Sequence, residues 1–209
     1  MKKNYLSQIA VLATTALFTF GCGNNAPVKE ATVEKAATET APTTTAAPTN
    51  PRFTIAPEEF AELNEKALGL MAKFEFDAWG NMMADNVLFT FPDGDIDTRT
   101  KLEGKAAVLG WWKAWKEKSG VESMSMSEFN HFPLNVTEQP KGGALMGNYD
   151  FCYFSNKIVF AGKPVLLRMN FIAHFNADKK IDRYTTYYDR SVIIKATGKN
   201  MIEELKAKK

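Results

Sequence analysis

The sequence contains little cysteine and little histidine, with two of each among 209 residues. A closed zinc site of the usual kind is therefore unattainable, and we expect no metal and no bound cofactor. An excess of charge of one sign is also missing, because 26 basic residues nearly balance 24 acidic ones. No excess remains to hold a phosphate backbone, so we expect no nucleic-acid partner. Hydrophobic residues make up 45% of the chain and aromatic residues 12%, which is enough to bury a core.

A long hydrophobic run is missing as well. Residues 9–20 are uncharged and largely apolar, but this stretch of about a dozen residues is shorter than the roughly 20 that a membrane-spanning helix needs. Lys2 and Lys3 precede it. A basic start followed by a short apolar stretch is typical of a signal peptide.

The signal ends with Gly21-Cys22, and this small residue followed by cysteine resembles the lipobox of bacterial lipoproteins. The resemblance implies that Cys22 is lipidated, becomes the first residue of the mature chain and anchors the protein to a membrane of the bacterial cell envelope. The alternative is an ordinary secretory signal that contains a cysteine.

Residues 23–52 consist mainly of Ala, Thr and Pro with scattered charges. Such a segment cannot offset its ordering entropy by burial, so we expect a disordered tether with a coil span of about 30 Å. If Cys22 is acylated, Cys152 has no partner within the chain and no structural disulfide forms. The sequence thus predicts a signal at 1–22, a tether at 23–52 and one folded domain at 53–209.

The first part of that domain carries helical patterns. Acidic residues follow Pro57, and apolar residues then recur at three- and four-residue spacing up to Phe74, which predicts a first helix. We expect a second short helix at 77–84, a β-run at 87–91, and a third helix after Gly104 with Trp111, Trp112 and Trp115 on one face.

The remainder is typical of long strands. Residues 123–136, 144–155, 164–176 and 181–194 are rich in aromatic and β-branched residues and are separated by Gly, Pro, Asn and Asp. Residues 200–209 predict a charged, frayed helix. Helices followed by meandering strands favour an α+β domain with an antiparallel sheet.

Several short motifs, in this order, carry a family resemblance. They are Ala84-Asp85-Asn86-Val87, Phe89-Thr90-Phe91-Pro92, Glu103-Gly104-Lys105-Ala106-Ala107, Ala161-Gly162-Lys163-Pro164, Ala173-His174-Phe175-Asn176, Lys180-Ile181 and Tyr187-Tyr188-Asp189. The chain from about 57 to 195 resembles the nuclear transport factor 2-like superfamily, which includes snoaL-like polyketide cyclases, ketosteroid isomerases and limonene epoxide hydrolases. The resemblance implies a cone in which three N-terminal helices pack inside a curved antiparallel sheet, with a small-molecule pocket at the open end.

The catalytic groups of those relatives are missing at the matching positions. The resemblance places the isomerase carboxylates near Phe91 and Phe171 and the isomerase phenol near Ala67. The aspartate that acts in the epoxide hydrolases corresponds to Thr186. Isomerisation would lack both its base and its oxyanion donors, so the sequence leans against an enzyme.

A mostly apolar set of side chains could line the pocket. The predicted ligand-binding residues are Phe91, Trp111, Trp112, Met169, Phe171, Tyr184, Thr186 and Tyr188. Apolar walls with a few polar groups are typical of ligand sites, but the same aromatics could simply fill the cone. The weak catalytic candidates are Asp150, Tyr184 and Tyr188, and strand parity alone does not place Asp150 on either face.

Strand parity puts both histidines away from the pocket. His174 alternates with the apolar residues of 164–176, and His131 lies opposite the face formed by Met124, Met126 and Phe132. We expect both histidines at solvent or at a subunit interface.

Three functions follow, in order of preference. The first is a membrane-tethered module that binds a small, largely apolar molecule in its cone. The second is a snoaL-like isomerase, cyclase or hydrolase. The third is a homodimeric assembly module that uses the outer sheet face around Arg168, Asn170 and His174.

Overall fold

The computed structural model describes residues 52–93 and 99–206. In chain order the elements are β1 (Phe53–Ile55), α1 (Glu59–Ala72), α2 (Phe76–Gly80), β2 (Met83–Thr90), β3 (Lys101–Glu103), α3 (Lys105–Ser119), β4 (Val121–Val136), β5 (Gly147–Phe160), β6 (Lys163–Phe175), β7 (Ile181–Tyr188), α4 (Arg190–Thr197) and α5 (Met201–Lys206). The predicted α+β class, with three helices before the long strands, is confirmed.

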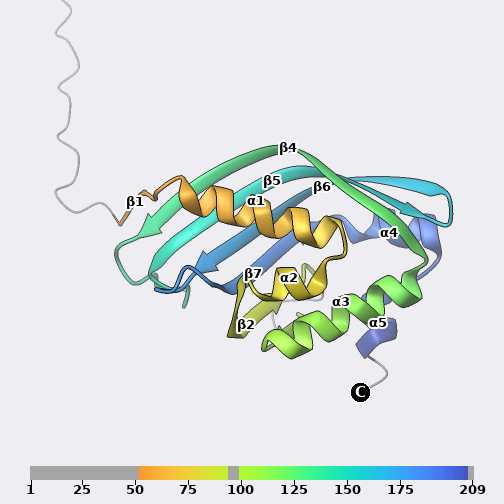
Figure 1. The fold of residues 1–209 in the computed structure, drawn as a ribbon, viewed down its shortest axis with the longest axis horizontal. Helices are drawn as coiled ribbons and strands as arrows, with labels where there is room; N and C mark the ends of the chain where they lie inside the picture. The colour runs from red at the N-terminus through yellow and green to blue at the C-terminus, as the bar shows by residue number, and fades with distance from the viewer. Residues whose placement is uncertain (1–51, 94–98, 207–209) are drawn as a thin grey trace, which may run out of the picture. The chain divides into compact units, whose positions relative to one another are not determined.

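The strands of the described residues form one sheet in the order β1-β4-β5-β6-β7-β2-β3. Neighbouring strands are antiparallel except β2 and β7, which run parallel. The sheet curves, and α1 lies across the concave side of β4, β5 and β6 while α2 and α3 lie below it (Figure 1). The concave face therefore meets the helices, as the resemblance implied.

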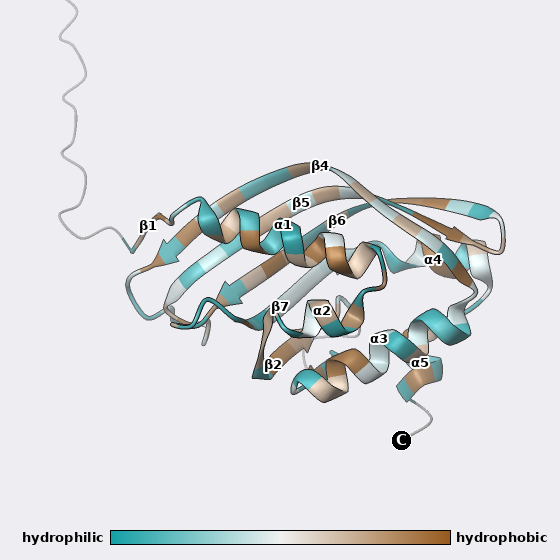
Figure 2. Ribbon diagram, viewed as in Figure 1, coloured by the Kyte–Doolittle hydropathy of each residue, from teal (hydrophilic) through white to brown (hydrophobic). Residues whose placement is uncertain are grey.

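Helix and strand patterns explain which side chains form the core between these layers. Phe60, Ala67, Leu68 and Met71 bury one face of α1. Hydrophobic and hydrophilic residues alternate along the long strands (Figure 2), and in β6 the alternate residues from Val165 to Phe175 are buried, as predicted. Burial of these apolar faces is the main stabilising contribution to the fold.

Gly120 ends α3 and allows the chain to enter β4 directly. Its φ of 76° lies in the left-handed region, where a glycine carries no Cβ penalty. Because the turn is tight, the tryptophans of α3 stay packed under the sheet that follows.

A β-bulge changes the facing of β4. The β4–β5 register shifts between Ser127 and Asn130, where Glu128 has a φ of 55°. The extra residue exchanges the two faces of the strand. Phe132 is consequently 53% exposed, and His131 contacts α1, so the predicted parity of β4 after the bulge is wrong.

The C-terminal region also differs from the prediction. Strand β7 ends at Tyr188, because the Asp189 side chain accepts a hydrogen bond from the Ser191 amide (2.9 Å) and caps α4. The predicted strand at 181–194 is therefore too long. Helix α5 is not simply a charged end of the chain, since Met201 and Ile202 are buried in the core.

Other boundaries shift by a few residues. The second helix ends at Gly80 and not at Ala84, whose neighbour Met83 already begins β2. Strand β5 begins at Gly147 and reaches Phe160, and the short strands β1 and β3 were not predicted. The predicted signal peptide, Cys22 and nearly all of the predicted tether lie outside the described residues.

Candidate functional site

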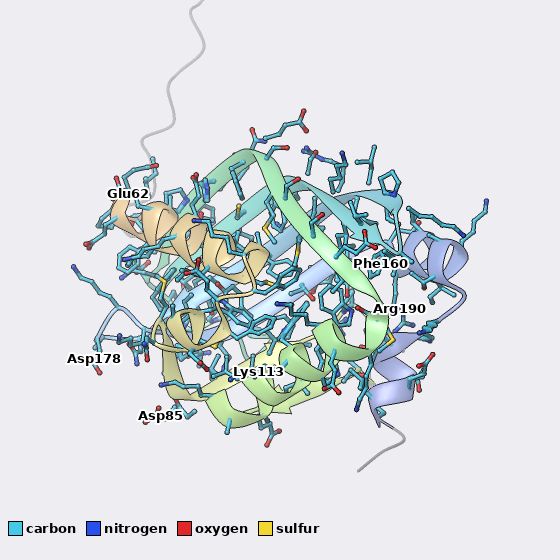
Figure 3. All side chains as sticks on the ribbon, turned by 45° about the vertical axis from the view of Figure 1, so that its right-hand side comes forward. Glu62, Asp85, Lys113, Phe160, Asp178 and Arg190 are labelled. Carbon is cyan, nitrogen blue, oxygen red and sulfur yellow. The ribbon has the colours of Figure 1, made fainter. Side chains whose placement is uncertain are left out.

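A cavity lies between α3, the concave face of β5 and β6, and the C-terminal helices. Its volume is about 40 Å³, which is room for about two or three water molecules. Its apolar wall consists of Met71, Trp111, Trp112, Trp115, Met124, Ile158, Met169, Phe171, Ile193, Ile194, Met201 and Ile202. Arg190, also in the wall, lies on the side of the domain where α4 and α5 lie (Figure 3). The C-terminal helices therefore close one side of this cavity.

Four buried polar atoms on the lining residues have no hydrogen-bond partner among residues 52–93 and 99–206. They are Trp111 Nε1, Trp112 Nε1, Asn156 Oδ1 and Arg190 Nη1. The Arg190 guanidinium forms an ion pair with Asp93, whose Oδ2 is 4.0 Å from Arg190 Nη1 and beyond hydrogen-bond distance. A buried polar group without a partner costs about 1–3 kcal/mol, so four such atoms on residues that line one cavity favour a bound group or water there.

The amide of Asn156 is held at its nitrogen end. Its Nδ2 donates to Met169 Sδ at 3.3 Å, a weak acceptor, which leaves Oδ1 as the unpartnered atom. Three donors, from two indoles and one guanidinium, therefore accompany one acceptor in the wall. The balance of the site favours a ligand that accepts hydrogen bonds.

Tyr188 is the catalytic candidate that lines this cavity. Burial raises the pKa of its phenol, and the nearby Arg190 charge opposes that rise only in part. The phenol is protonated at neutral pH and can donate a hydrogen bond, but it does not act as a ready base.

The other two catalytic candidates lie in a separate hydrogen-bonded chain beneath α1. Tyr184 Oη donates to Asn64 Oδ1 (3.2 Å), and Asn64 Nδ2 donates to Asp150 Oδ2 (2.7 Å). Asp150 is fully buried, and its contact with Asn64 of α1 places it on the concave face. Burial raises the pKa of Tyr184, so this phenol is also protonated. The structure thus brings Asp150 and Tyr184 together and separates both from Tyr188.

His131 belongs to the same chain. Its Nδ1 lies 2.8 Å from Asp150 Oδ2, and its Nε2 lies 3.2 Å from Glu65 Oε2 and 3.9 Å from Cys152 Sγ. Ligand atoms of His131, Asp150 and Cys152 all lie within 4.8 Å of one another, close enough to hold a metal ion. The prediction that His131 lies at solvent or at an interface is wrong, because the β4 bulge turns it inward. A single left-handed residue in mid-strand leaves no clear signal in the sequence.

Cys152 is the thiol of this cluster and is fully buried. Burial, followed by the negative charges of Asp150 and Glu65, raises its pKa. The thiol is therefore neutral and a poor nucleophile at neutral pH.

His174 lies on the other face of the sheet and is nevertheless buried. Its Nδ1 is 2.5 Å from Asp182 Oδ1, and its Nε2 is 3.0 Å from the carbonyl oxygen of Met146. The loop between β4 and β5 covers it, so the expectation of a solvent or interface histidine is wrong here too.

The predicted lining residues divide into two groups. Trp111, Trp112, Met169, Phe171 and Tyr188 line the cavity. Phe91, Tyr184 and Thr186 do not: Phe91 and Tyr184 pack against other rings, and Thr186 Oγ1 donates to the Thr90 carbonyl at 3.1 Å. Both alternatives thus apply, with rings filling most of the cone and a small cavity remaining beside the C-terminal helices.

Sequence reasoning missed Arg190 and Asn156. Arg190 fell within the overextended strand prediction, and Asn156 was not assigned to a face. An available signal was the spacing from Cys152, because Asn156 and Cys152 share the even-numbered, buried face of β5.

The outer face of the sheet exposes aromatic side chains. Tyr153 is 46% exposed and Tyr187 45%, and both pair with Asn170 across the strands. Arg168, named for the predicted dimer face, is exposed and pairs with Glu128 at 3.2 Å, whereas Asn170 is buried and donates to the Cys152 carbonyl.

Within residues 52–93 and 99–206, no helix has both the length and the apolar character needed to cross a membrane.

Comparison with known proteins identifies the fold. No protein-family model matches the sequence, and no curated protein matches it significantly. Among solved structures, a candidate isomerase from Bacillus subtilis has a TM-score of 0.51 at 20% identity. The match covers 68% of this chain and 94% of the isomerase chain. A candidate polyketide cyclase from Xanthomonas campestris has a TM-score of 0.51 at 14% identity, over 68% and 98% of the two chains. AusH from Aspergillus nidulans has a TM-score of 0.50 at 9% identity, over 66% and 88%. At these identities the likeness concerns the fold alone, and the domain shares the α+β fold of these three structures.

Proposed function

We propose that the domain binds a small, largely apolar molecule that carries a carboxylate or a similar hydrogen-bond-accepting anion. The observation that carries this proposal is a set of buried donors on the lining residues, Trp111 Nε1, Trp112 Nε1 and Arg190 Nη1, which have no hydrogen-bond partner within the described part of the chain. An ionised carboxylate accepts several hydrogen bonds at once, and those from guanidinium are among the strongest in proteins. The apolar wall then accommodates the rest of the molecule.

The C-terminal helices are the natural entrance. A volume of about 40 Å³ holds no more than a small polar head, so a larger ligand requires the wall to move. Helix α4 contributes Arg190, Ile193 and Ile194 to the wall but contains no buried residue. Segments with little burial open at low free-energy cost, so displacement of α4 is the least costly way to enlarge the cavity.

Binding without turnover is the form of this proposal that the geometry favours. Of the catalytic candidates, Tyr188 lines the cavity, while Asp150 and Tyr184 do not. A phenol whose pKa is raised is a poor general base, and no carboxylate lines the cavity among residues 52–93 and 99–206.

The test compares acids with their uncharged counterparts. Thermal shift of the full chain is measured with medium-chain and aryl carboxylic acids and with the matching primary amides. We expect the acids to raise the melting temperature and to bind about 10–100-fold more tightly than the amides, because a hydrogen bond to a charged group contributes about 1.5–3 kcal/mol.

Arg190→Gln should remove the difference between acid and amide. The matched control is Arg168→Gln, which alters an exposed arginine on the outer face of the sheet and should leave the difference unchanged. If no acid shifts the melting temperature, or if both variants behave alike, the proposal fails.

We also propose that Cys22 carries a lipid that tethers the domain to the bacterial cell envelope. The support is the order of a basic start, a short apolar stretch and Gly21-Cys22, followed by Ala, Thr and Pro. Several acyl chains would anchor the domain firmly, whereas one would not. Labelling with a fatty-acid analogue should mark the wild type and not Cys22→Ala; equal labelling of both would contradict the anchor.

A homodimer through the outer sheet face is proposed as the assembly state. Its support is the exposure of Phe132, Tyr153, Leu166 and Tyr187 on the long strands. Light scattering should give twice the monomer mass for wild type and a lower mass for Tyr153→Glu. A wild-type monomer would contradict this use of the face.

A further inference from the structure

The cluster beneath α1 gathers more acceptors than donors around one imidazole. His131 stands directly opposite Cys152 in the β4–β5 ladder, and Asp150 lies two residues before Cys152 on the same strand face. Glu65 reaches the same ring from α1. Four side chains from three elements therefore converge, with two carboxylates, one thiol and one imidazole among them.

We propose that His131 Nε2, Cys152 Sγ and the Glu65 carboxylate bind a divalent transition-metal ion of the zinc class. Asp150, whose Oδ2 is already engaged by His131 Nδ1 and Asn64 Nδ2, is the positioning residue. Zinc in proteins bonds to nitrogen at about 2.0–2.1 Å, to oxygen at about 2.0–2.2 Å and to sulfur at about 2.3 Å. Tetrahedral angles then separate the ligand atoms by about 3.3–3.6 Å. His131 Nε2 lies 3.2 Å from Glu65 Oε2, just below this range, and 3.9 Å from Cys152 Sγ, just above it, so metal binding requires small shifts of these side chains.

Asp150 supplies the outer-shell partner that a metal-binding histidine usually has. Its Oδ2 lies 2.8 Å from His131 Nδ1, which fixes the ring so that Nε2 faces the other two ligands. Asn64 holds the same oxygen at 2.7 Å. The second oxygen, Asp150 Oδ1, is buried and has no hydrogen-bond partner within the described part of the chain. A buried, undersatisfied carboxylate beside a thiol and a second carboxylate favours a nearby cation.

The proposed site has an open side. The Glu65 side chain is 55% exposed and that of His131 is 12% exposed, so an ion can enter at the edge between α1 and β4. Three protein ligands leave the fourth position to water, as in catalytic zinc sites and unlike the closed four-ligand sites that the composition excludes.

Cobalt is the direct probe. The full chain in a Cys22→Ser background, where Cys152 is the remaining cysteine, is stripped with a chelator and titrated with Co²⁺ and then Zn²⁺. We expect one ion per chain, visible d–d bands of tetrahedral Co²⁺ and a near-ultraviolet thiolate-to-cobalt charge-transfer band, all abolished by Zn²⁺. The absence of the charge-transfer band would overturn the proposal.

Variants assign the ligands. Cys152→Ser should abolish the charge-transfer band, and His131→Gln should weaken Zn²⁺ binding by more than about 100-fold, beyond the 10–100-fold typical of an outer-shell loss. The matched control is His174→Gln, because that histidine also pairs with a carboxylate but contacts none of these ligands. Circular dichroism checks the folding of each variant; should the buried variants misfold, Glu65→Gln replaces them, since its side chain is half exposed. Equal Zn²⁺ affinity of the wild type and the folded ligand variants would overturn the proposal.

Discussion

The two ends of the concave face have opposite imbalances between hydrogen-bond donors and acceptors. At the end closed by α4 and α5, residues of the cavity lining carry buried indole and guanidinium donors that have no hydrogen-bond partner among the described residues. At the end beneath α1, two carboxylates and a thiol surround the single imidazole of His131. Because buried polar groups are normally satisfied, the first end suits an anion and the second a cation. One curved sheet can therefore present a donor-rich end and an acceptor-rich end when different helices pack against each end.

Removing the central aromatic ring at the cavity end should produce the largest loss in the free energy of unfolding. Trp112 is buried and packs against Phe89, Phe91, Trp111 and Trp115. Trp112→Ala should lower the free energy of unfolding by about 3–5 kcal/mol, as measured by urea denaturation. Added indole should restore part of the loss by filling the apolar hole. A loss below about 1 kcal/mol would show that the ring is not part of the packed wall.

The end beneath α1 should lose stability when Asp150 is replaced by a side chain of the same shape without its charge. Asp150→Asn retains the volume but weakens the hydrogen bonds to Asn64 and His131, so we expect a loss of about 1–3 kcal/mol in the free energy of unfolding. Zn²⁺ affinity should fall about 10–100-fold as well. The control is Asp182→Asn, the carboxylate partner of His174, which should leave Zn²⁺ affinity unchanged. Equal effects of the two variants on Zn²⁺ affinity would remove the distinction between these pairs.

Acid should loosen the cavity end through Asp93. Burial by itself raises the pKa of this carboxyl, but hydrogen bonds from Thr100 and Lys206 outweigh burial and hold the pKa below its ordinary value. A group with a lowered pKa stabilises the fold above its unfolded pKa of about 3.9, and this contribution is lost as pH falls through the folded value. Stability should therefore decrease as pH falls from about 5 through the lowered pKa of the folded state.

Lys206 connects this loss of stability in acid to α5. Its Nζ lies 3.0 Å from Asp93 Oδ2, so protonation of Asp93 removes a contact that holds the C-terminal helix. The protection of α5 amides from hydrogen exchange, relative to the intrinsic rate at each pH, should fall in acid for the wild type, whereas Asp93→Asn should show low protection at every pH. Parallel pH profiles for the two proteins would contradict this role.

The smallest effect on stability is expected for Glu65→Gln. Its side chain is 55% exposed, and exposed ion pairs contribute about 0–1 kcal/mol. Chemical denaturation of the metal-free protein should change by less than about 0.5 kcal/mol. Zn²⁺ affinity should nevertheless fall, and a large stability loss would indicate a structural role in place of a metal-binding one.

The secondary structure was largely predictable because its signals are local. The stripe of α1, the start of α3 after Gly104 and the alternation in β6 all appear in the sequence and in the fold. The end of β7 was missed although its signal is also local: Asp189 caps α4, but aromatic and β-branched residues on both sides favoured a longer strand.

The candidate site was predictable only in part. The apolar wall followed from aromatic residues on faces that parity could assign, and Trp111, Trp112 and Met169 do line the cavity. Arg190 and Asn156 were missed because their place in the site depends on which other residues are buried beside them. His131 was placed on the wrong face because one extra residue at Glu128 exchanges inside and outside for the rest of β4.

The sequence alone determined the class of fold, the order of its elements and the apolar character of the core, because hydrophobic periodicity and turn residues act over a few positions. The tertiary structure decided which polar groups meet. Asn64, His131, Asp150 and Tyr184 come from four elements and form one hydrogen-bonded chain only after the sheet has curved around α1. Such contacts depend on register, bulges and layer packing, which join residues far apart in the chain.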